Sequence, residues 1–386
     1  MYDVIIIGAG PAGLMAAIAL KDKNVLIIEK NITAGKKLLL TGGGRCNVTN
    51  LKDNNSFLNE VDYNKKYLYS AINNFGPYEI YNFFSEHGVE LKEEDDNKIF
   101  PVSNKAKDIL NVLLDNIDCE IKYNEEVTNI NDNEVITNNG RYKYNSLIIA
   151  TGGSSFKKTG STGDNIKFAK LLNQPTIDLF PAEVGVILEE KNELAGTSFE
   201  NITIRYDRKE KTGNLMFTHK GIGGSAIMQL SEFIYKNVNK EIVIDFKPDL
   251  SIDDVIHLIS DFNREDGVVN FLNSLFTKRF SAYLVTKLNL DKKIKSLTKS
   301  EIEKLINAIK EHVYIVDSVC PLEEAYVTGG GIDLNYVDTT TMESKINKGI
   351  YFVGEALDIH GPIGGYNITL ALSTGYLAGS KINEKR

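Results

Sequence analysis

The first thirty residues constrain the fold of this chain more than any other stretch. Val4–Ile7 is a run of four apolar, mostly β-branched residues, which is typical of a strand buried on both faces. Gly8–Gly13 follows at once and matches the pattern G-x-G-x-x-G, and Ala12–Leu20 is an uncharged run of helix-forming residues. Val25–Ile28 has the composition of a second strand, and Glu29 follows it directly. This order of strand, glycine turn, helix, strand and acid predicts a Rossmann-like α/β domain that binds a dinucleotide.

Each conspicuous residue of this stretch has a physical role in such a site. Gly8 allows the tight turn from strand to helix, Gly10 lets the backbone approach a pyrophosphate, and Gly13 lets the helix pack closely on the strand. The helix N-terminus offers free N–H groups and the positive end of its dipole to the phosphates. Glu29 can accept hydrogen bonds from a ribose 2′-OH, and its charge disfavours a 2′-phosphate. An ordinary glycine turn is the alternative, which the flanking elements disfavour.

Length, charge and cysteine content narrow the class of protein. A chain of 386 residues suggests two or three domains. The net charge of −8 argues against nucleic acid as the main partner. Cys46, Cys119 and Cys320 lie far apart without a C-x-x-C pair, as expected of free thiols in a reducing cytoplasm. The apolar run at the N-terminus lacks the positive region of a signal peptide, and no later segment predicts a membrane span. We therefore expect a cytoplasmic protein without a metal site.

Two further glycine-rich stretches point to the same ligand. Thr41–Asn50 contains three successive glycines followed by Arg45, Cys46 and Asn47, which predicts a loop passing close to a flat ligand. A flexible linker is the alternative interpretation. The apolar run Ser146–Ala150 ends in Thr-Gly-Gly, as a second strand crossing the dinucleotide would.

The middle of the chain changes in pattern. Residues 65–88 have helical spacing with many aromatic side chains, which we interpret as packing, and residues 120–144 predict a small β-meander of four short strands. Residues 177–246 are β-rich around an expected helix at 226–235, and residues 251–312 are helical in pattern. Gly221–Ala226 formally matches G-x-G-x-x-A. The short preceding strand and the missing acid favour a turn that contacts substrate or flavin over a nicotinamide fold.

The last sixty residues supply the other half of the expected site. Ile350–Glu355 is a buried strand that ends in Gly-Glu, which places a carboxylate where a ribityl hydroxyl can bond it. Gly361–Asn367 then leads into a helix over Ile368–Gly379, and its glycine pair directs free N–H groups at one point. Such a point suits the N1–C2=O edge of a flavin, where negative charge collects on reduction.

Taken in order, the motifs resemble one family nearly end to end. They are GAGPAG with Glu29, TGGGRCNVTN, ATGGSS and TGSTGD, LMFTHKGIGGSA, TGGGI and TMESK, and finally YFVGEALD and GPIGGYN. Together they resemble the BaiN/YhiN-type bacterial flavoproteins, which include aminoacetone oxidases and the 3-dehydro-bile acid Δ4,6-reductase. The resemblance implies an α/β Rossmann-like FAD-binding domain of the two-dinucleotide-binding type from residues 1–186 and 329–386. It further implies a β-barrel-like insert from 187–248 and 313–328 and a small helical domain from 249–312.

The resemblance also implies the residues that contact FAD. They are Gly8, Gly10, Ala12, Gly13, Glu29, Lys37, Arg45, Asn47, Val127, Thr151, Gly152, Gly153, Asp164, Gly354, Glu355, Gly365, Asn367 and Ile368. The chain departs from the family pattern at His360, where a second acid is more common, and in the helix after Asn367, which lacks the usual aromatic residue.

A bound FAD implies an oxidoreductase acting on a small molecule. The leading hypothesis is reduction of an activated C=C bond by hydride from flavin N5, with NAD(P)H as the diffusible electron donor. The rival hypothesis is oxidation of a small amine with O2, which gives H2O2. Thiol–disulfide chemistry is disfavoured because no paired redox cysteines are present. A flavin-containing protein that binds RNA or another partner is the non-enzymatic alternative, and the acidic charge weighs against RNA.

Three side chains are candidates for catalysis. His360 is the first choice for proton transfer, because a histidine near a flavin can titrate near neutral pH. A solvated loop histidine is its alternative interpretation. Cys46 could act as a nucleophile or acid, although a buried, inert thiol is the simpler expectation. His219 follows a short strand and could line the substrate side.

Overall fold

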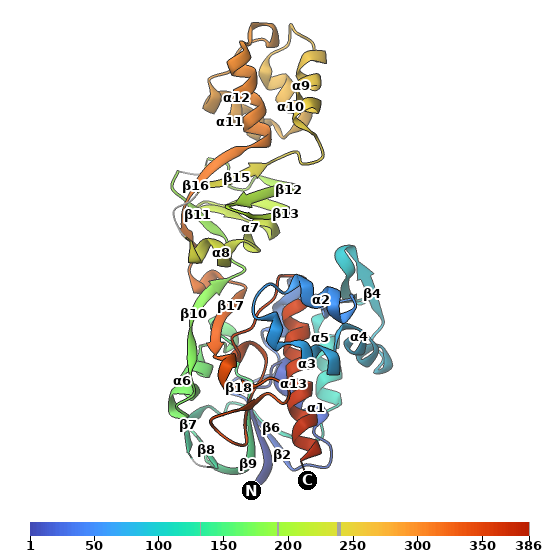
Figure 1. The fold of residues 1–386 in the computed structure, drawn as a ribbon. Helices are drawn as coiled ribbons and strands as arrows, with labels where there is room; N and C mark the ends of the chain where they lie inside the picture. The colour runs from blue at the N-terminus through green and yellow to red at the C-terminus, as the bar shows by residue number, and fades with distance from the viewer. Residues whose placement is uncertain (132, 191–192, 238–240, 386) are drawn as a thin grey trace. The chain divides into compact units, whose positions relative to one another are not determined.

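The computed structural model describes residues 1–131, 133–190, 193–237 and 241–385 (Figure 1). The chain separates into two compact units. Unit 1 comprises Met1–Phe180 and Tyr326–Arg386, and unit 2 comprises Pro181–Ala325. The domain ranges expected from the sequence include residues 132, 191–192, 238–240 and 386, which lie outside the described residues. The finer boundaries between three domains stay a prediction.

Unit 1 is built on a parallel sheet in which β1 is central. Its five parallel strands run in the order β6 (Glu120–Lys122), β2 (Val25–Ile28), β1 (Tyr2–Ile7), β9 (Arg141–Ile149) and β20 (Ile350–Phe352). The short strands β19 (Glu343–Ser344) and β18 (Val337–Asp338) extend the β20 edge in antiparallel fashion. The apolar runs of β1 and β2 are buried because helices and loops cover both faces of a parallel sheet. Strands from both ends of the chain therefore meet in one Rossmann-type sheet.

The region expected to be a four-stranded meander is divided differently. Only β7 (Val127–Asn131), β8 (Glu134–Thr137) and the first half of β9 pair in antiparallel fashion. Glu120–Lys122 instead joins the parallel sheet beside β2, and β9 continues without a break from the meander into that sheet. The prediction of separate strands at this point was wrong, because no glycine or proline interrupts residues 141–149.

The helices of unit 1 pack around a close pair. α1 (Pro11–Ala19) packs against α13 (Tyr366–Glu384) and against α5 (Ala106–Asp115). The remaining helices are α2 (Asn54–Glu60), α3 (Tyr69–Asn74), α4 (Pro77–Glu86) and α6 (Asp164–Leu171). The helical pattern at 65–88 is thus divided between α3 and α4. The division falls at Pro77, which has no N–H to continue α3 and stands at the first position of α4.

Two small sheets complete unit 1. β3 (Thr49–Asn50), β5 (Lys98–Pro101) and β4 (Leu91–Glu94) form an antiparallel sheet. β10 (Thr176–Ala182) pairs with β17 (Val327–Ile332), and these two strands lie where the chain leaves and re-enters unit 1.

The described residues of unit 2 form a closed barrel and six helices, four of which follow one another between β15 and β16. The barrel order is β11 (Val186–Leu188), β14 (Gly221–Gly223), β13 (Lys209–Phe217), β12 (Ser198–Tyr206), β15 (Glu241–Asp245) and β16 (His312–Val319). The helices between β15 and β16 are α9 (Ile252–Asp261), α10 (Val268–Leu275), α11 (Lys278–Leu288) and α12 (Lys299–Lys310). The expected fold, a Rossmann-like domain with a barrel-like insert and a helical segment, is confirmed.

The second glycine motif belongs to the barrel. Its glycines form β14 and the turn that follows, and the helix expected at 226–235 is two short helices, α7 (Ser225–Met228) and α8 (Ser231–Lys236). β14 pairs in antiparallel fashion with β11 and β13, so this motif forms no parallel nucleotide-binding unit. Within the described residues, no helix is both long and apolar enough to cross a membrane.

Candidate functional site

A cavity of about 420 Å³ lies within unit 1 at the carboxyl ends of its parallel strands. Its walls include the residues that directly follow four strands: Gly8 after β1, Glu29 after β2, Ala150 after β9 and Val353 after β20. In open α/β sheets, ligands bind in this crevice. The volume also falls in the range of small-molecule and cofactor pockets, about 300–1,000 Å³.

The glycine motif gives this cavity an open helix N-terminus. Gly8 has φ +105°, and a Cβ there would lie 2.5 Å from the carbonyl oxygen of Ala150. A Cβ on Gly13 would lie 2.1 Å from the carbonyl oxygen of Gly8, so α1 can approach β1 only with glycine there. Gly10, the N-cap of α1, has no atom near its ideal Cβ position and lines the cavity. The first N–H groups of α1 therefore border free space of the kind that a phosphate can fill.

Acidic side chains gather at one end of the cavity. Glu29 is only 7% exposed, and its carboxylate accepts hydrogen bonds from the Ala9 N–H at 2.9 Å and the Asn31 N–H at 2.8 Å. Asp164 also lines this end and pairs with Lys30 at 2.6 Å. Carboxylates accept hydrogen bonds from sugar hydroxyls and repel an added phosphate, so this end suits an unphosphorylated ribose.

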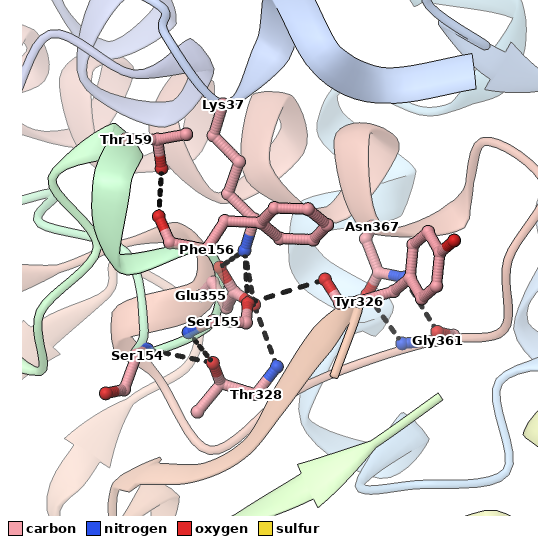
Figure 2. A network of polar contacts seen from close by, with 10 residues as sticks. All are labelled: Lys37, Ser154, Ser155, Phe156, Thr159, Tyr326, Thr328, Glu355, Gly361 and Asn367. Atoms are coloured by element: carbon pink, nitrogen blue, oxygen red, sulfur yellow. Dashed lines mark hydrogen bonds and ion pairs between the residues drawn. The ribbon is translucent and has the colours of Figure 1, made fainter. Parts of the chain in front are cut away.

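A polar network crosses the cavity wall at Glu355, as Figure 2 shows. Lys37 Nζ lies 2.7 Å from Glu355 Oε2 and 2.6 Å from Ser155 Oγ. The Thr328 N–H donates to Glu355 Oε1 at 2.9 Å, and Thr328 Oγ1 accepts from the N–H groups of Ser154 and Ser155. Glu355 is thereby held at the cavity by residues from three distant parts of the chain. Sequence reasoning missed Ser155 and Thr328, although hydroxyl residues beside their glycine runs were a usable signal.

The opposite end of the cavity is formed by the start of α13. Gly365 has φ +92°, and a Cβ there would lie 2.5 Å from the carbonyl carbon of Thr49. Asn367 folds back on the preceding loop, where its side chain accepts from the Gly361 N–H at 2.9 Å and donates to the Gly361 carbonyl at 2.7 Å (Figure 2). The loop is thereby fixed, and the first turn of α13 lines the cavity through Asn367 and Ile368.

Two buried polar atoms test whether the cavity fits FAD. Asn47 Oδ1 and Thr151 Oγ1 belong to cavity-lining residues and have no hydrogen-bond partner among the described residues. Buried polar atoms are normally paired, so their position in the wall favours a ligand with hydrogen-bonding groups at both places. FAD has ribityl and ribose hydroxyls, a pyrophosphate and a flavin N3–H, which match two helix N-termini, carboxylates and these acceptors. The residues present therefore fit the cofactor.

Fifteen of the residues expected to contact FAD line this cavity; the exceptions are Gly13, Arg45 and Gly153. Gly13 serves the packing of α1 on β1, and a Cβ on Gly153 would lie 2.5 Å from Thr328 Oγ1. Arg45 pairs with Glu94 at 2.9 Å, and its guanidinium lies 4.0 Å from the ring centre of Phe100, a lining residue. Cofactor binding by each of these residues stays a prediction.

The three catalytic candidates lie in different surroundings. His360 is 6% exposed and stacks on Tyr63, and its neighbour Ile359 lines the cavity. Cys46 is fully buried, and burial raises the pKa of its thiol to about 12, so thiolate is scarce at neutral pH. His219 is exposed in the turn between β13 and β14 of unit 2. These catalytic roles stay predictions. Burial weighs against Cys46 as a nucleophile.

Known proteins match this chain over nearly its whole length. A family model described as HI0933-like protein Rossmann domain matches residues 2–381. The ribosomal RNA dihydrouridine synthase of Escherichia coli (strain K12) is 28% identical over 396 residues, which cover 97% of this chain and 96% of that protein. The 3-dehydro-bile acid delta(4,6)-reductase of Clostridium scindens is 29% identical over 418 residues and covers 100% of both chains.

Solved structures give the same fold at low identity. The 3-ketosteroid-delta4-(5alpha)-dehydrogenase from Rhodococcus jostii RHA1 is 14% identical, with a TM-score of 0.53 over 99% of this chain and 96% of that chain. The 3-ketosteroid delta1-dehydrogenase from Sterolibacterium denitrificans is 12% identical, with a TM-score of 0.53 over 100% of both chains. At this identity the likeness concerns the fold alone.

Proposed function

Because the chain belongs to the HI0933-like family of Rossmann-domain proteins, a family of FAD-dependent oxidoreductases, we propose that it reduces a C=C bond conjugated to a carbonyl group. Membership confirms the resemblance to the BaiN/YhiN-type flavoproteins. When bound and reduced, FAD would supply a hydride from its N5 atom, and NAD(P)H is the proposed electron donor.

The observation that carries this proposal is the cavity in unit 1, with a helix N-terminus at each end and unpaired acceptors in its wall. Glu29 and Glu355 are positioned to bind sugar and ribityl hydroxyls. In this proposal the N–H groups at the start of α13 would face the N1–C2=O edge of a bound flavin, where negative charge collects on reduction. Ile359, Ile363 and Ile368 give the same end an apolar wall, which suits an apolar, conjugated substrate.

The names of the two relatives point to the same type of bond, a C=C bond conjugated to a carbonyl group. Dihydrouridine is uridine whose ring C=C bond, conjugated to a carbonyl, has been reduced. A delta(4,6)-reductase of a 3-dehydro-bile acid acts on C=C bonds conjugated to a ring ketone. The shared chemistry supports reduction of an activated alkene over amine oxidation.

Two classes of molecule are candidates for the substrate that contains this bond. We propose a small conjugated carbonyl compound, in keeping with the net charge of −8, which disfavours non-specific binding to RNA. Uridine in ribosomal RNA is the second candidate. The match of the Escherichia coli ribosomal RNA dihydrouridine synthase over nearly the whole chain favours it.

The test follows the flavin spectrum without air. We expect the purified protein to be yellow and to bleach on addition of NADH or NADPH. Adding a 4-en-3-one steroid should then restore the spectrum of oxidised flavin. If ribosomal RNA restores that spectrum instead, and mass spectrometry detects dihydrouridine in the RNA, the second candidate is supported. The reductase proposal would be overturned if NAD(P)H did not reduce the flavin while an amine did, with H2O2 formed in air. That result would favour the oxidase. Protein that does not bind added FAD would contradict both.

A further inference from the structure

A group of titratable and aromatic side chains lies beside the cavity, next to its lining residue Ile359. It consists of Tyr63 from the segment after α2, Phe180 from β10, and Asp358 and His360 from the loop before α13. The residue between the last two, Ile359, lines the cavity. Asp358, His360 and Phe180 are 5%, 6% and 6% exposed, whereas Tyr63 is half-buried. Tyr63 is therefore the most exposed member of this group.

Asp358 organises the group through hydrogen bonds. The Tyr63 hydroxyl donates to Asp358 Oδ1 at 2.9 Å, and Asn64 Nδ2 donates to Asp358 Oδ2 at 3.0 Å and to the Asp358 carbonyl at 2.7 Å. The other polar neighbours of the carboxylate are His360 and the backbone of Gly330. Across the described ranges, no lysine or arginine forms an ion pair with Asp358. The carboxylate is therefore buried with no lysine or arginine paired to it, and His360 is its nearby charge partner.

The rings hold the Tyr63 hydroxyl in place. The imidazole of His360 stacks on the Tyr63 ring, with centroids 4.5 Å apart and planes inclined by 16°. The Phe180 ring meets both edge-on, at 5.9 Å from Tyr63 and 6.0 Å from His360. Because these two rings pack against the Tyr63 ring, its hydroxyl has few other orientations and stays in contact with the carboxylate of Asp358.

Burial gives the carboxyl of Asp358 an unusual affinity for protons. Burial raises the pKa of Asp358, while the hydrogen bonds from Tyr63 and Asn64, the nearby His360 and the backbone of Gly330 act in the opposite direction. A carboxyl with a raised pKa can hold a proton and return it nearer to neutral pH than an ordinary aspartate. Groups of this kind in a cleft are candidates for proton transfer.

We propose that Tyr63 donates the proton that completes the reduction, that Asp358 restores the proton to Tyr63, and that His360 positions the Tyr63 ring. This role rests on the proposed function. The π component of the C=C bond would break as one carbon accepts the hydride that bound, reduced FAD would supply. The other carbon forms a C–H bond with the proton from the Tyr63 hydroxyl. The tyrosinate then takes the proton of the Asp358 carboxyl, which is recharged from solvent, and NAD(P)H returns the two electrons.

The first test uses Tyr63→Phe, which keeps the stacked ring and removes only the hydroxyl. We expect FAD retention and flavin reduction by NAD(P)H to match the natural chain, and reoxidation by the alkene to slow by about 10²–10⁴-fold, the usual contribution of a proton donor. Tyr67→Phe is the matched control, because the Tyr67 hydroxyl lies in the same segment but bonds Asn335 at the surface. An unchanged reoxidation rate in Tyr63→Phe would overturn the proposal. Loss of NAD(P)H reduction in the natural chain would overturn the proposed function instead.

A second test needs neither FAD nor turnover. The infrared carbonyl band of a protonated carboxyl can be followed against pH in the FAD-free chain. We expect a band that persists above the pH range of ordinary aspartates and is missing in Asp358→Asn. Because the Tyr63 hydrogen bond lowers the pKa of Asp358, Tyr63→Phe should carry the band to still higher pH. A band that Asp358→Asn leaves in place, or that Tyr63→Phe does not move, would contradict the relay.

Discussion

Glu29 combines two roles in one side chain. Its carboxylate accepts hydrogen bonds from Ala9 and Asn31, which fixes the turn after β1 against the end of β2. The same residue lines the cavity. One buried carboxylate therefore makes a structural contact and is also the predicted ribose ligand, and removing the whole side chain would not distinguish the two effects.

Glu29→Gln separates these roles because it keeps the shape and an acceptor oxygen but removes the charge. We expect FAD to bind about tenfold more weakly or worse, since charge-assisted hydrogen bonds contribute about 1.5–3 kcal/mol. Quenching of FAD fluorescence on titration with apoprotein measures the dissociation constant. Glu120→Gln, at the far edge of the same sheet, is the control and should leave the constant unchanged. An unaltered constant in Glu29→Gln would remove the ribose assignment.

At the scale of elements, the site depends on how closely α13 packs on α1. A Cβ on Gly375 would lie 2.2 Å from the Ala12 carbonyl oxygen, and one on Gly379 would lie 2.4 Å from the Ala16 carbonyl oxygen. The same two helices open the cavity at their N-termini. The separation of the two N-termini is therefore set by two glycines of α13 that lie roughly two to four turns past its first residue.

Gly375→Val should force these helices apart. Overpacking of this kind costs about 1–3 kcal/mol, and each kcal/mol lowers the melting temperature by about 2–4 °C in a domain of this size. We also expect the ratio of bound FAD to protein to fall. Ser380→Val introduces the same side chain at a half-exposed position of α13 and controls for helix propensity. Full FAD occupancy with an unchanged melting temperature would show that the contact does not position the site.

Elements with strong local signals could be predicted from the sequence, and weaker ones could not. β1, α1 and β2 lie where their apolar runs and glycines indicate. The placement of Glu120–Lys122 beside β2 was missed, because strand pairing depends on partners far away in the chain rather than on composition. Pro77 marks the division of the 65–88 pattern in the sequence itself, because proline has no N–H with which to continue a helix.

At the scale of the whole molecule, the two units have separate hydrophobic cores. The core of unit 1 surrounds its parallel sheet, and the core of unit 2 lies in the barrel and its helices. The cavity is lined entirely by residues of unit 1. A ligand of that cavity should therefore stabilise one core directly and leave the other unaffected.

Calorimetry of the full chain should show this difference. We expect two unfolding transitions, and we expect FAD to raise the midpoint temperature of only one of them. The reason is that FAD at a hundred times its dissociation constant adds about 2.7 kcal/mol to the free energy of unfolding of the unit that binds it. Riboflavin, which lacks the pyrophosphate and adenosine, should give a smaller shift at the same concentration. One transition that moves as a whole would show that the units unfold together.

The sequence by itself determined the class of fold and indicated the glycine motifs at both ends of the chain that line the cavity. The reason is local: a strand, a glycine turn and a helix N-terminus are encoded by neighbouring residues. Only the tertiary structure decided which distant groups meet. Lys37 pairs with Glu355 across 318 positions, and Tyr63 bonds Asp358 across 295. The burial that raises the pKa of Cys46 to about 12, and that of Asp358 above its ordinary value, arises only when those segments pack together.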